Sequence, residues 1–182
     1  MSEQQEAYYP YWYPVQIRFR DLDPLAHVNN TVYFIYLEEA RGAYFDQLAP
    51  WMSQWPSGEE HQYQDPEQKT PEQVAEPTNP RIRIGPRGRH YGMLVKENTC
   101  TYLLPIVHSD QVEVGVRIAH VGRTSFVMEC ELRDMKDTER IYATAKAVMV
   151  WCNYHTGRPY PVPPAMRAAF EKMEGRSFPA PE

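Results

Sequence analysis

The stretch FRDLDPLAHVNNTVYFIYLEEAR, residues 19–41, changes character halfway along. Its first part crowds two aspartates, one histidine and two adjacent asparagines into ten residues, and its second part is apolar and aromatic. From Thr31 to Leu48 the apolar residues recur at three-and-four spacing over a broad face, which predicts a mostly enclosed helix. Its polar residues are expected to leave only a thin exposed stripe, made of Glu38, Glu39, Arg41 and Asp46.

The start of this helix explains the polar crowd before it. The first N–H groups of a helix have no partner within the helix, and Asn30 stands where an N-cap residue would accept one of them. We interpret the loop before Asn30 as a segment that caps these donors. The same loop can direct a charge, carried by Asp23, toward whatever binds them.

Strand-like patterns flank the helix. Residues 14–20 alternate apolar and polar side chains, which is the period of a strand with one buried face. Further along, two short connections suit antiparallel hairpins, at residues 122–124 and 134–139. Four runs have strand character, namely Met93–Leu104, Gln111–Val121, Ser125–Arg133 and Ile141–Cys152.

A second helix is predicted for Ala165–Glu174, which follows two prolines and stops at Gly175. One long apolar helix followed by an antiparallel meander of four strands is an α+β pattern. Such a sheet buries its apolar face by curling around the helix.

The domain organisation follows from a long interruption. Residues 50–90 hold seven of the seventeen prolines and no periodic apolar face, which is typical of a functional lid or a poorly ordered segment. We therefore predict an N-terminal tail at 1–13 and one domain at 14–162 with a proline-rich insertion at about 50–90. A C-terminal helix and tail occupy 163–182.

Composition excludes several classes of function. A net charge of −5 argues against a general nucleic-acid binder, whose footprint would be basic. We find neither an apolar stretch long enough to span a membrane nor a secretory signal, so we expect a cytoplasmic protein with no membrane partner. Cys100, Cys130 and Cys152 are odd in number and lack CxxC spacing, which favours reduced thiols over a disulfide frame or a zinc site.

Three motifs carry a resemblance to a known family. They are the D-x-D-x-x-x-H-V-N-N core of residues 21–30, Tyr-x-x-Pro at 102–105, and GRTSF at 122–126. With them the chain resembles the hotdog-fold acyl-CoA thioesterases of the 4-hydroxybenzoyl-CoA thioesterase type over residues 14–48 and 93–161. The plant acyl-ACP thioesterases look like more distant relatives through the same HVNN string.

The resemblance implies a hotdog fold, in which an antiparallel sheet wraps around a long central helix. It further implies a homodimer or homotetramer with sites at the subunit interface, and hydrolysis of a fatty or aromatic acyl thioester of coenzyme A. No metal is implied, and no cofactor apart from the coenzyme A of the substrate. Two departures stand out: Ala26 replaces a glycine that many relatives carry, so we expect a slightly different loop path, and the 50–90 insertion is unusually long.

By position, the resemblance assigns the catalytic carboxylate to Asp23, as nucleophile or general base, and the backbone N–H that polarises the carbonyl to Asn30. His27 is either a catalytic residue, which orients a water or forms a hydrogen bond with Asp23, or a structural one. Asp21 is expected to accept loop N–H groups, and Asn29 to pin the loop. The predicted substrate-binding residues are Asn29, Tyr33, Arg123, Thr124 and Ser125, the last three at the phosphates of the coenzyme.

Further candidates complete the set. An arginine run could hold the same phosphates, Glu97 could approach the site of a partner subunit, and the aromatic N-terminal segment is expected to pack on the sheet or the partner. The run consists of Arg81, Arg83, Arg87 and Arg89, and an acyl pocket could be lined by Trp51, Trp55 and Tyr63. An enoyl-thioester hydratase of the same fold and a catalytically silent acyl-thioester binding module are the alternatives.

Overall fold

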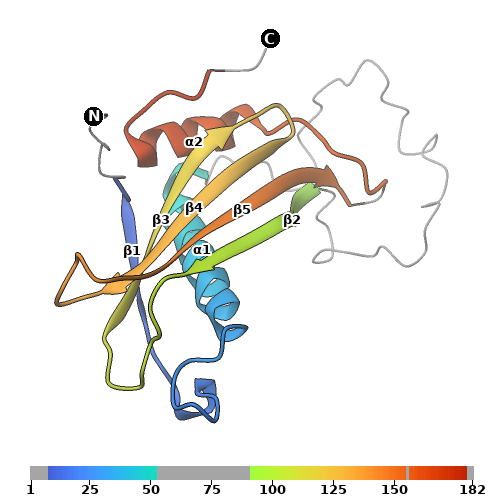
Figure 1. Ribbon diagram of the computed structural model, residues 1–182. Coiled ribbons are helices and arrows are strands. Elements are labelled where there is room, and N and C mark those ends of the chain that lie inside the picture. Colours follow the sequence, from blue (N-terminus) through green and yellow to red (C-terminus); the bar gives the residue numbers. More distant parts are fainter. Residues whose placement is uncertain (1–7, 53–90, 155, 180–182) are drawn as a thin grey trace, which may run out of the picture.

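The described residues form one five-stranded antiparallel sheet with two α-helices (Figure 1). The computed structural model describes residues 8–52, 91–154 and 156–179. Strand order across the sheet is β1-β3-β4-β5-β2, and a short 3-10 turn, η1, precedes the long helix. The elements are β1 Tyr11–Val15, η1 Phe19–Asp21, α1 Val32–Met52, β2 Tyr91–Tyr102, β3 Val112–Val121, β4 Ser125–Asp134, β5 Ile141–Asn153 and α2 Pro164–Glu174. The predicted α+β class, with an antiparallel sheet around a central helix, is confirmed.

The predicted order of the strands is correct only in part. The three strands β3, β4 and β5 form the expected meander, joined by the two predicted hairpins. The prediction of a four-strand meander is wrong, because β2 pairs with β5, from Tyr91 opposite Asn153 to Tyr102 opposite Ala143. The edge of β3 that β2 would have taken is filled by β1. The segment after β2 therefore carries the chain from one edge of the sheet back toward the other.

The first strand lies closer to the N-terminus than predicted. The predicted strand at 14–20 is wrong beyond Val15, because the Arg18 N–H donates to Asp21 Oδ2 at 2.8 Å and closes the turn η1. Residues 11–13, which were predicted to belong to a tail, are part of β1 instead. Phe19, which the alternating pattern placed inside, is 82% exposed.

The aromatic N-terminal segment packs on the sheet, as predicted. The ring of Trp12 lies over β3 at Gly115, where an added Cβ would approach it to 2.7 Å. Strand β3 also pairs with β4, and the Arg133 guanidinium of β4 lies 3.3 Å from the centre of the Trp12 ring. Glycine at position 115 thus provides the space that this ring occupies.

Helix α1 supplies the centre of the core. Its start agrees with the prediction within one residue, but it continues past Leu48 to Met52 and includes Pro50, which costs one backbone hydrogen bond in the last turn. Helix α2 packs beside α1 and β3 (Figure 1). An aromatic cluster joins these layers, made of Phe45, Phe126 and Phe170.

One member of the expected exposed stripe of α1 is buried instead. Arg41 is only 6% exposed and lies among the core-facing residues of the helix, so its placement on the thin exposed stripe is wrong. The other core-facing residues of the helix are Tyr33, Tyr36, Leu37, Ala40, Tyr44 and Leu48.

The three cysteines are free thiols, so the prediction of no disulfide frame is confirmed. Burial raises the pKa of the Cys130 thiol to about 12, which keeps that thiol protonated. None of the helices in the described ranges is long and apolar enough to cross a membrane.

The loop between η1 and α1 is closed by its own backbone. Leu22 and Val28 form an isolated bridge, and the Asp23 N–H donates to the His27 carbonyl at 2.9 Å. The Ala26 N–H donates to the Asp23 carbonyl at 3.0 Å, and Ala26 has a φ of 62°. This is the left-handed region that glycine adopts freely, so Ala26 is strained at the position where the resemblance implies glycine.

A buried carboxyl group connects both helices to the sheet. Glu174 Oε1, on α2, accepts the Tyr44 hydroxyl of α1 and the Ile118 N–H of β3, each at 2.6 Å. Burial raises the pKa of Glu174 above its ordinary value, although the two hydrogen bonds oppose the shift.

We expect Glu174→Gln to become more stable relative to wild type as pH rises. Because the folded-state pKa of Glu174 is raised, the folded protein binds the proton more tightly than the unfolded chain does. The contribution of this group to wild-type stability therefore falls from the unfolded pKa, about 4.3, upward through the folded pKa. Denaturant unfolding over a pH series measures the difference, and the exposed variant Glu139→Gln should track wild type. A difference in unfolding free energy between Glu174→Gln and wild type that stays constant with pH would contradict the raised pKa of Glu174.

We expect Ala26→Gly to stabilise the protein by about 0.5–1 kcal/mol. Relief of left-handed strain, about 1–2 kcal/mol, outweighs the greater freedom of glycine in the unfolded chain, about 0.4–1 kcal/mol. The matched control is Ala43→Gly in the interior of α1, which should cost about 1 kcal/mol. Denaturant unfolding of both variants provides the test, and a loss of stability in Ala26→Gly would refute the strain.

Candidate active site

Asp21 is the buried anchor of the candidate loop. Its Oδ2 accepts the Arg18 N–H and the Tyr36 hydroxyl, each at 2.8 Å, and its carbonyl accepts the Asn29 N–H at 2.9 Å. The side chain is 7% exposed, which suits a structural acceptor and not a group that meets substrate. Burial, together with the bond to Asp21, raises the pKa of Tyr36.

Asp23 is oriented from both sides and remains accessible. Its Oδ1 accepts the Leu25 N–H at 2.8 Å, and its Oδ2 lies 3.3 Å from His27 Nδ1. The Asp23 side chain is 18% exposed and that of His27 34%. Of the roles considered for His27, the geometry favours the one in which it contacts the Asp23 carboxylate. A carboxylate held in this way has one position from which to act on a bound molecule.

The helix is capped by Asn29 and not, as predicted, by the side chain of Asn30. Asn29 Oδ1 accepts both the backbone N–H and the hydroxyl of Thr31, at 2.9 and 2.7 Å, and the Asn29 carbonyl accepts the Val32 N–H at 2.9 Å. The predicted role of Asn29 in pinning the loop therefore agrees with these bonds. The backbone path brings Asn29, one residue earlier than expected, into the capping position.

Asn30 contributes its backbone to the site. Its carbonyl accepts the hydroxyl of Tyr102 at 2.9 Å. Within residues 8–52, 91–154 and 156–179, no acceptor takes the Asn30 N–H. A donor at the start of a buried helix, without an internal partner, suits the stabilisation of a developing negative charge.

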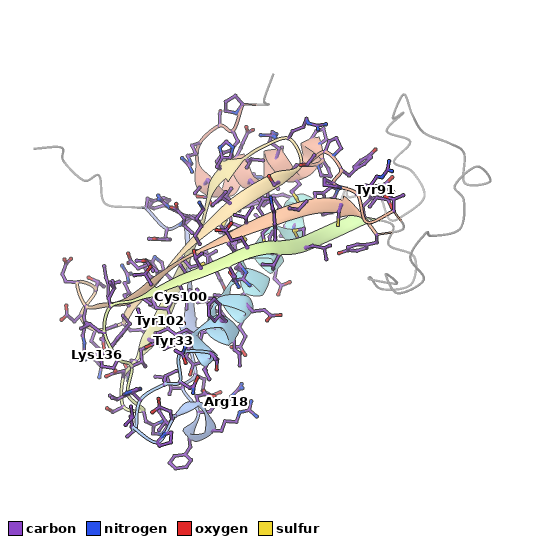
Figure 2. All side chains as sticks on the ribbon, turned by 45° about the vertical axis from the view of Figure 1, so that its right-hand side comes forward. Arg18, Tyr33, Tyr91, Cys100, Tyr102 and Lys136 are labelled. Carbon is purple, nitrogen blue, oxygen red and sulfur yellow. The ribbon has the colours of Figure 1, made fainter. Side chains whose placement is uncertain are left out.

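Two tyrosines stand beside this donor. The rings of Tyr33 and Tyr102 meet edge to face, with centroids 5.0 Å apart and planes at 89°. Figure 2 shows them close together with Cys100 beside the first turns of α1. Tyr33, predicted to bind substrate, is 3% exposed, whereas Tyr102 is 42% exposed and touches Asn30. Sequence reasoning noted Tyr102 only as part of the Tyr-x-x-Pro motif.

The predicted phosphate-binding residues lie elsewhere in the protomer. Arg123, Thr124 and Ser125 form the β3–β4 hairpin, where the Thr124 carbonyl accepts the Trp151 N–H. The Asp23 loop contacts the segment after β2, which leads into the other end of β3. A strand of ten residues separates the two ends by about 30 Å. One protomer therefore does not bring Asp23 and Arg123 into one site.

The remaining candidates have separate positions. Trp51, at the end of α1, lies under the Lys172 ammonium group at 4.8 Å, and Glu97 is exposed on β2 next to an irregularity of the strand. The arginines at 81, 83, 87 and 89, with Trp55 and Tyr63, lie outside the described residues. No group of three potential metal ligands occurs in the part of the chain that the structure describes.

Comparison with known proteins identifies the family of the chain. The family model of the thioesterase-like superfamily matches residues 17–170. A thioesterase from Thermus thermophilus, crystallised with coenzyme A and Zn, is 32% identical, with a TM-score of 0.64, covering 93% of this chain and 98% of that one. A Pseudomonas aeruginosa protein is 31% identical with a TM-score of 0.61, covering 87% and 95%.

A 1,4-dihydroxy-2-naphthoyl-CoA thioesterase from Synechocystis shares the fold, with 14% identity, a TM-score of 0.60 and coverage of 90% and 97%. A search of curated proteins found no match. The family match spans the candidate loop, α1, strands β2 to β5 and most of α2. The chain therefore belongs to the thioesterase-like superfamily and is a thioester hydrolase.

Proposed function

We propose that the protein hydrolyses an acyl-CoA thioester, with Asp23 as the catalytic carboxylate and the Asn30 N–H as the donor to the carbonyl oxygen. The observation that carries this proposal is the arrangement of one short loop. It holds the accessible Asp23–His27 pair and leads directly to a backbone donor without an internal acceptor. Thioester hydrolysis needs an activated oxygen on one side of the carbonyl and positive potential on the other.

Two routes use the same residues. In the first, Asp23 attacks the carbonyl carbon, the C–S bond breaks to release the thiolate of coenzyme A, and water then opens the mixed anhydride to give the acid. In the second, Asp23 takes a proton from a water that attacks the carbonyl carbon, and that proton leaves with the thiolate as the thiol. Both consume one water and yield one acid and one thiol. The proposed chemistry uses the chain's own residues and neither a metal nor a cofactor beyond the coenzyme A of the substrate.

His27 is the orienting partner in this proposal. Its Nδ1 lies 3.3 Å from Asp23 Oδ2, so it limits the rotation of the carboxylate, while the Leu25 N–H fixes the other oxygen. A carboxylate bound at both oxygens points along one direction. This preorganisation reduces the reorganisation that would otherwise precede attack.

The proposal includes a homodimer in which the hairpin of a second subunit supplies Arg123, Thr124 and Ser125 to the coenzyme. Support comes from the separation of these residues from Asp23 within one protomer, and from β2, which pairs only with β5 among the described strands. Its other edge leaves backbone groups able to pair with a second chain. Large exposed apolar side chains lie on and just after this strand, namely Val95, Tyr102, Leu103 and Leu104. We expect a dimeric or larger mass in solution, and a monomer that hydrolyses acyl-CoA fully would refute this part.

We expect Asp23→Asn to fold normally and to lose turnover by about two orders of magnitude or more, because it removes the nucleophile or base. The assay is thiol release from a panel of acyl-CoA substrates. Asp21→Asn is the matched control, since the same change two residues earlier disturbs a buried acceptor and should cost about 1–3 kcal/mol of stability.

Wild-type turnover in Asp23→Asn would end the assignment of this residue. Loss of enoyl absorbance without thiol release would indicate the hydratase, and binding without turnover would indicate the silent module.

A further inference from the structure

A buried cation on α1 has almost no partner among the described residues. Arg41 is 6% exposed, and its core-facing neighbours along the helix are mostly apolar. Its one hydrogen bond to another described residue runs from Nη1 to Asn98 Oδ1 at 3.5 Å, and none of the ion pairs in the described ranges includes it. A guanidinium has five N–H donors in a planar fork and keeps its charge in proteins. Most of this donor capacity is unused within the described ranges.

Arg41 is largely buried and has no carboxylate partner among the described residues. Desolvation disfavours the charged form, and burial accordingly lowers the pKa of Arg41, although Cys130 and Glu38 oppose the shift. The Cys130 thiol is itself kept protonated by burial, and Glu38 is exposed on the helix surface. Neither residue supplies a carboxylate within ion-pair distance. The side chain is therefore suited to meet an anion that comes from outside the described residues.

Two independent estimates, one along α1 and one along β2, give similar distances between Arg41 and the Asn30 donor. Tyr33 and Tyr102 meet beside Asn30, and Arg41 follows Tyr33 by eight helical residues, about 12 Å along α1. Asn98 precedes Tyr102 by four residues of β2, about 13 Å along the strand. The region between α1 and β2 that begins at the Asn30 donor and ends at the Arg41–Asn98 contact is therefore about 12 Å long, and we call it the strip.

The strip is lined by small side chains on its strand side, whereas α1 contributes the buried Leu37 between Tyr33 and Arg41. Side chains alternate along a strand, so Asn98, Cys100 and Tyr102 lie on the same face of β2. Cys100 is the residue of this face between the two ends of the strip. Cys100 pairs with Ala145 of β5, and both are half-buried. The neighbouring pairs of the same face join Asn98 to Ala147 and Tyr102 to Ala143. Ala143 and Ala147 are buried, and β5 therefore presents only short side chains to this face.

We propose that Arg41 and Asn98 form a subsite for a carboxylate at the far end of the acyl group, so that the enzyme prefers acyl-CoA substrates carrying a terminal acid. The inference rests on the proposed function, because the acyl group must start at the Asn30 donor. The guanidinium fork receives the carboxylate oxygens, and the Asn98 side chain holds the fork in place. Side chains of a helix lean toward its N-terminus, so Arg41 reaches back toward the thioester.

The test compares acyl-CoA substrates of equal chain length that end in a carboxylate or in a methyl group, over a series of lengths. Wild type is expected to hydrolyse the acid-ended member with a kcat/KM about tenfold or more higher. The length of the strip predicts that kcat/KM is highest for acid-ended acyl groups of intermediate chain length and not for the shortest. Arg41→Met should abolish the preference, Asn98→Leu should weaken it, and Arg158→Gln, which removes an exposed guanidinium, should leave it unchanged.

The ratio of the kcat/KM values of two substrates on the same variant is independent of the fraction of protein that is folded. If Arg41→Met folds poorly, Arg41→Lys, which keeps the charge, should retain part of the preference. Equal rates for both substrate types in wild type would overturn the subsite and leave the proposed function standing. A variant that loses melting temperature or dimer mass at an unchanged substrate ratio would also overturn it, because Arg41 would then pair with a carboxylate of the partner subunit. No thiol release from any substrate would overturn the proposed function itself, and the subsite with it.

Discussion

The fold and the candidate site both depend on the buried carboxylate of Asp21. One of its oxygens accepts a donor from the strand side, the Arg18 N–H, and a donor from the helix side, the Tyr36 hydroxyl. Its own carbonyl accepts the Asn29 N–H, which holds the far end of the loop. Removing one partner from a buried network of this kind leaves the others unsatisfied, so its members stabilise one another. The positions of Asp23 and of the helix start are set by this network.

The same arrangement separates two roles that the sequence places side by side. Asp21 and Asp23 have the same side chain, two residues apart, yet Asp21 is enclosed and accepts two donors on one oxygen, whereas Asp23 is accessible. A buried carboxylate held by such bonds suits a structural role, and an accessible, oriented one can act on a substrate. Burial, more than residue type, therefore distinguishes the anchor from the catalytic candidate.

Local periodicity predicted most of the fold, because the helix and the four later strands have long, regular apolar patterns. It failed where a short pattern had two explanations: residues 15–20 alternate like a strand, but the bond from Arg18 to Asp21 turns them. Strand order depends on which edge each strand fills, a long-range choice that local pattern does not contain. The two asparagines before α1 both suit a cap, and only the path of the backbone decided for Asn29. Arg41 was predicted to be exposed from its polarity, although its spacing places it on the buried face.

The distribution of the candidate residues constrains how the enzyme works. A motif in the sequence carries no distance, and the hairpin with Arg123 lies a full strand length from Asp23 in one protomer. The proposed catalytic loop at one end and the Arg123 hairpin at the other would serve a single ligand only if two copies of the chain combined their opposite ends. The proposed dimer would cover the exposed apolar residues near β2 and enclose the strip between Asn30 and Arg41. Enclosure lowers the local dielectric, which strengthens both the pull of the Asn30 N–H on a carbonyl oxygen and the pull of the guanidinium on an acid. Selection of the acyl group and activation of the thioester would then depend on the same desolvated space.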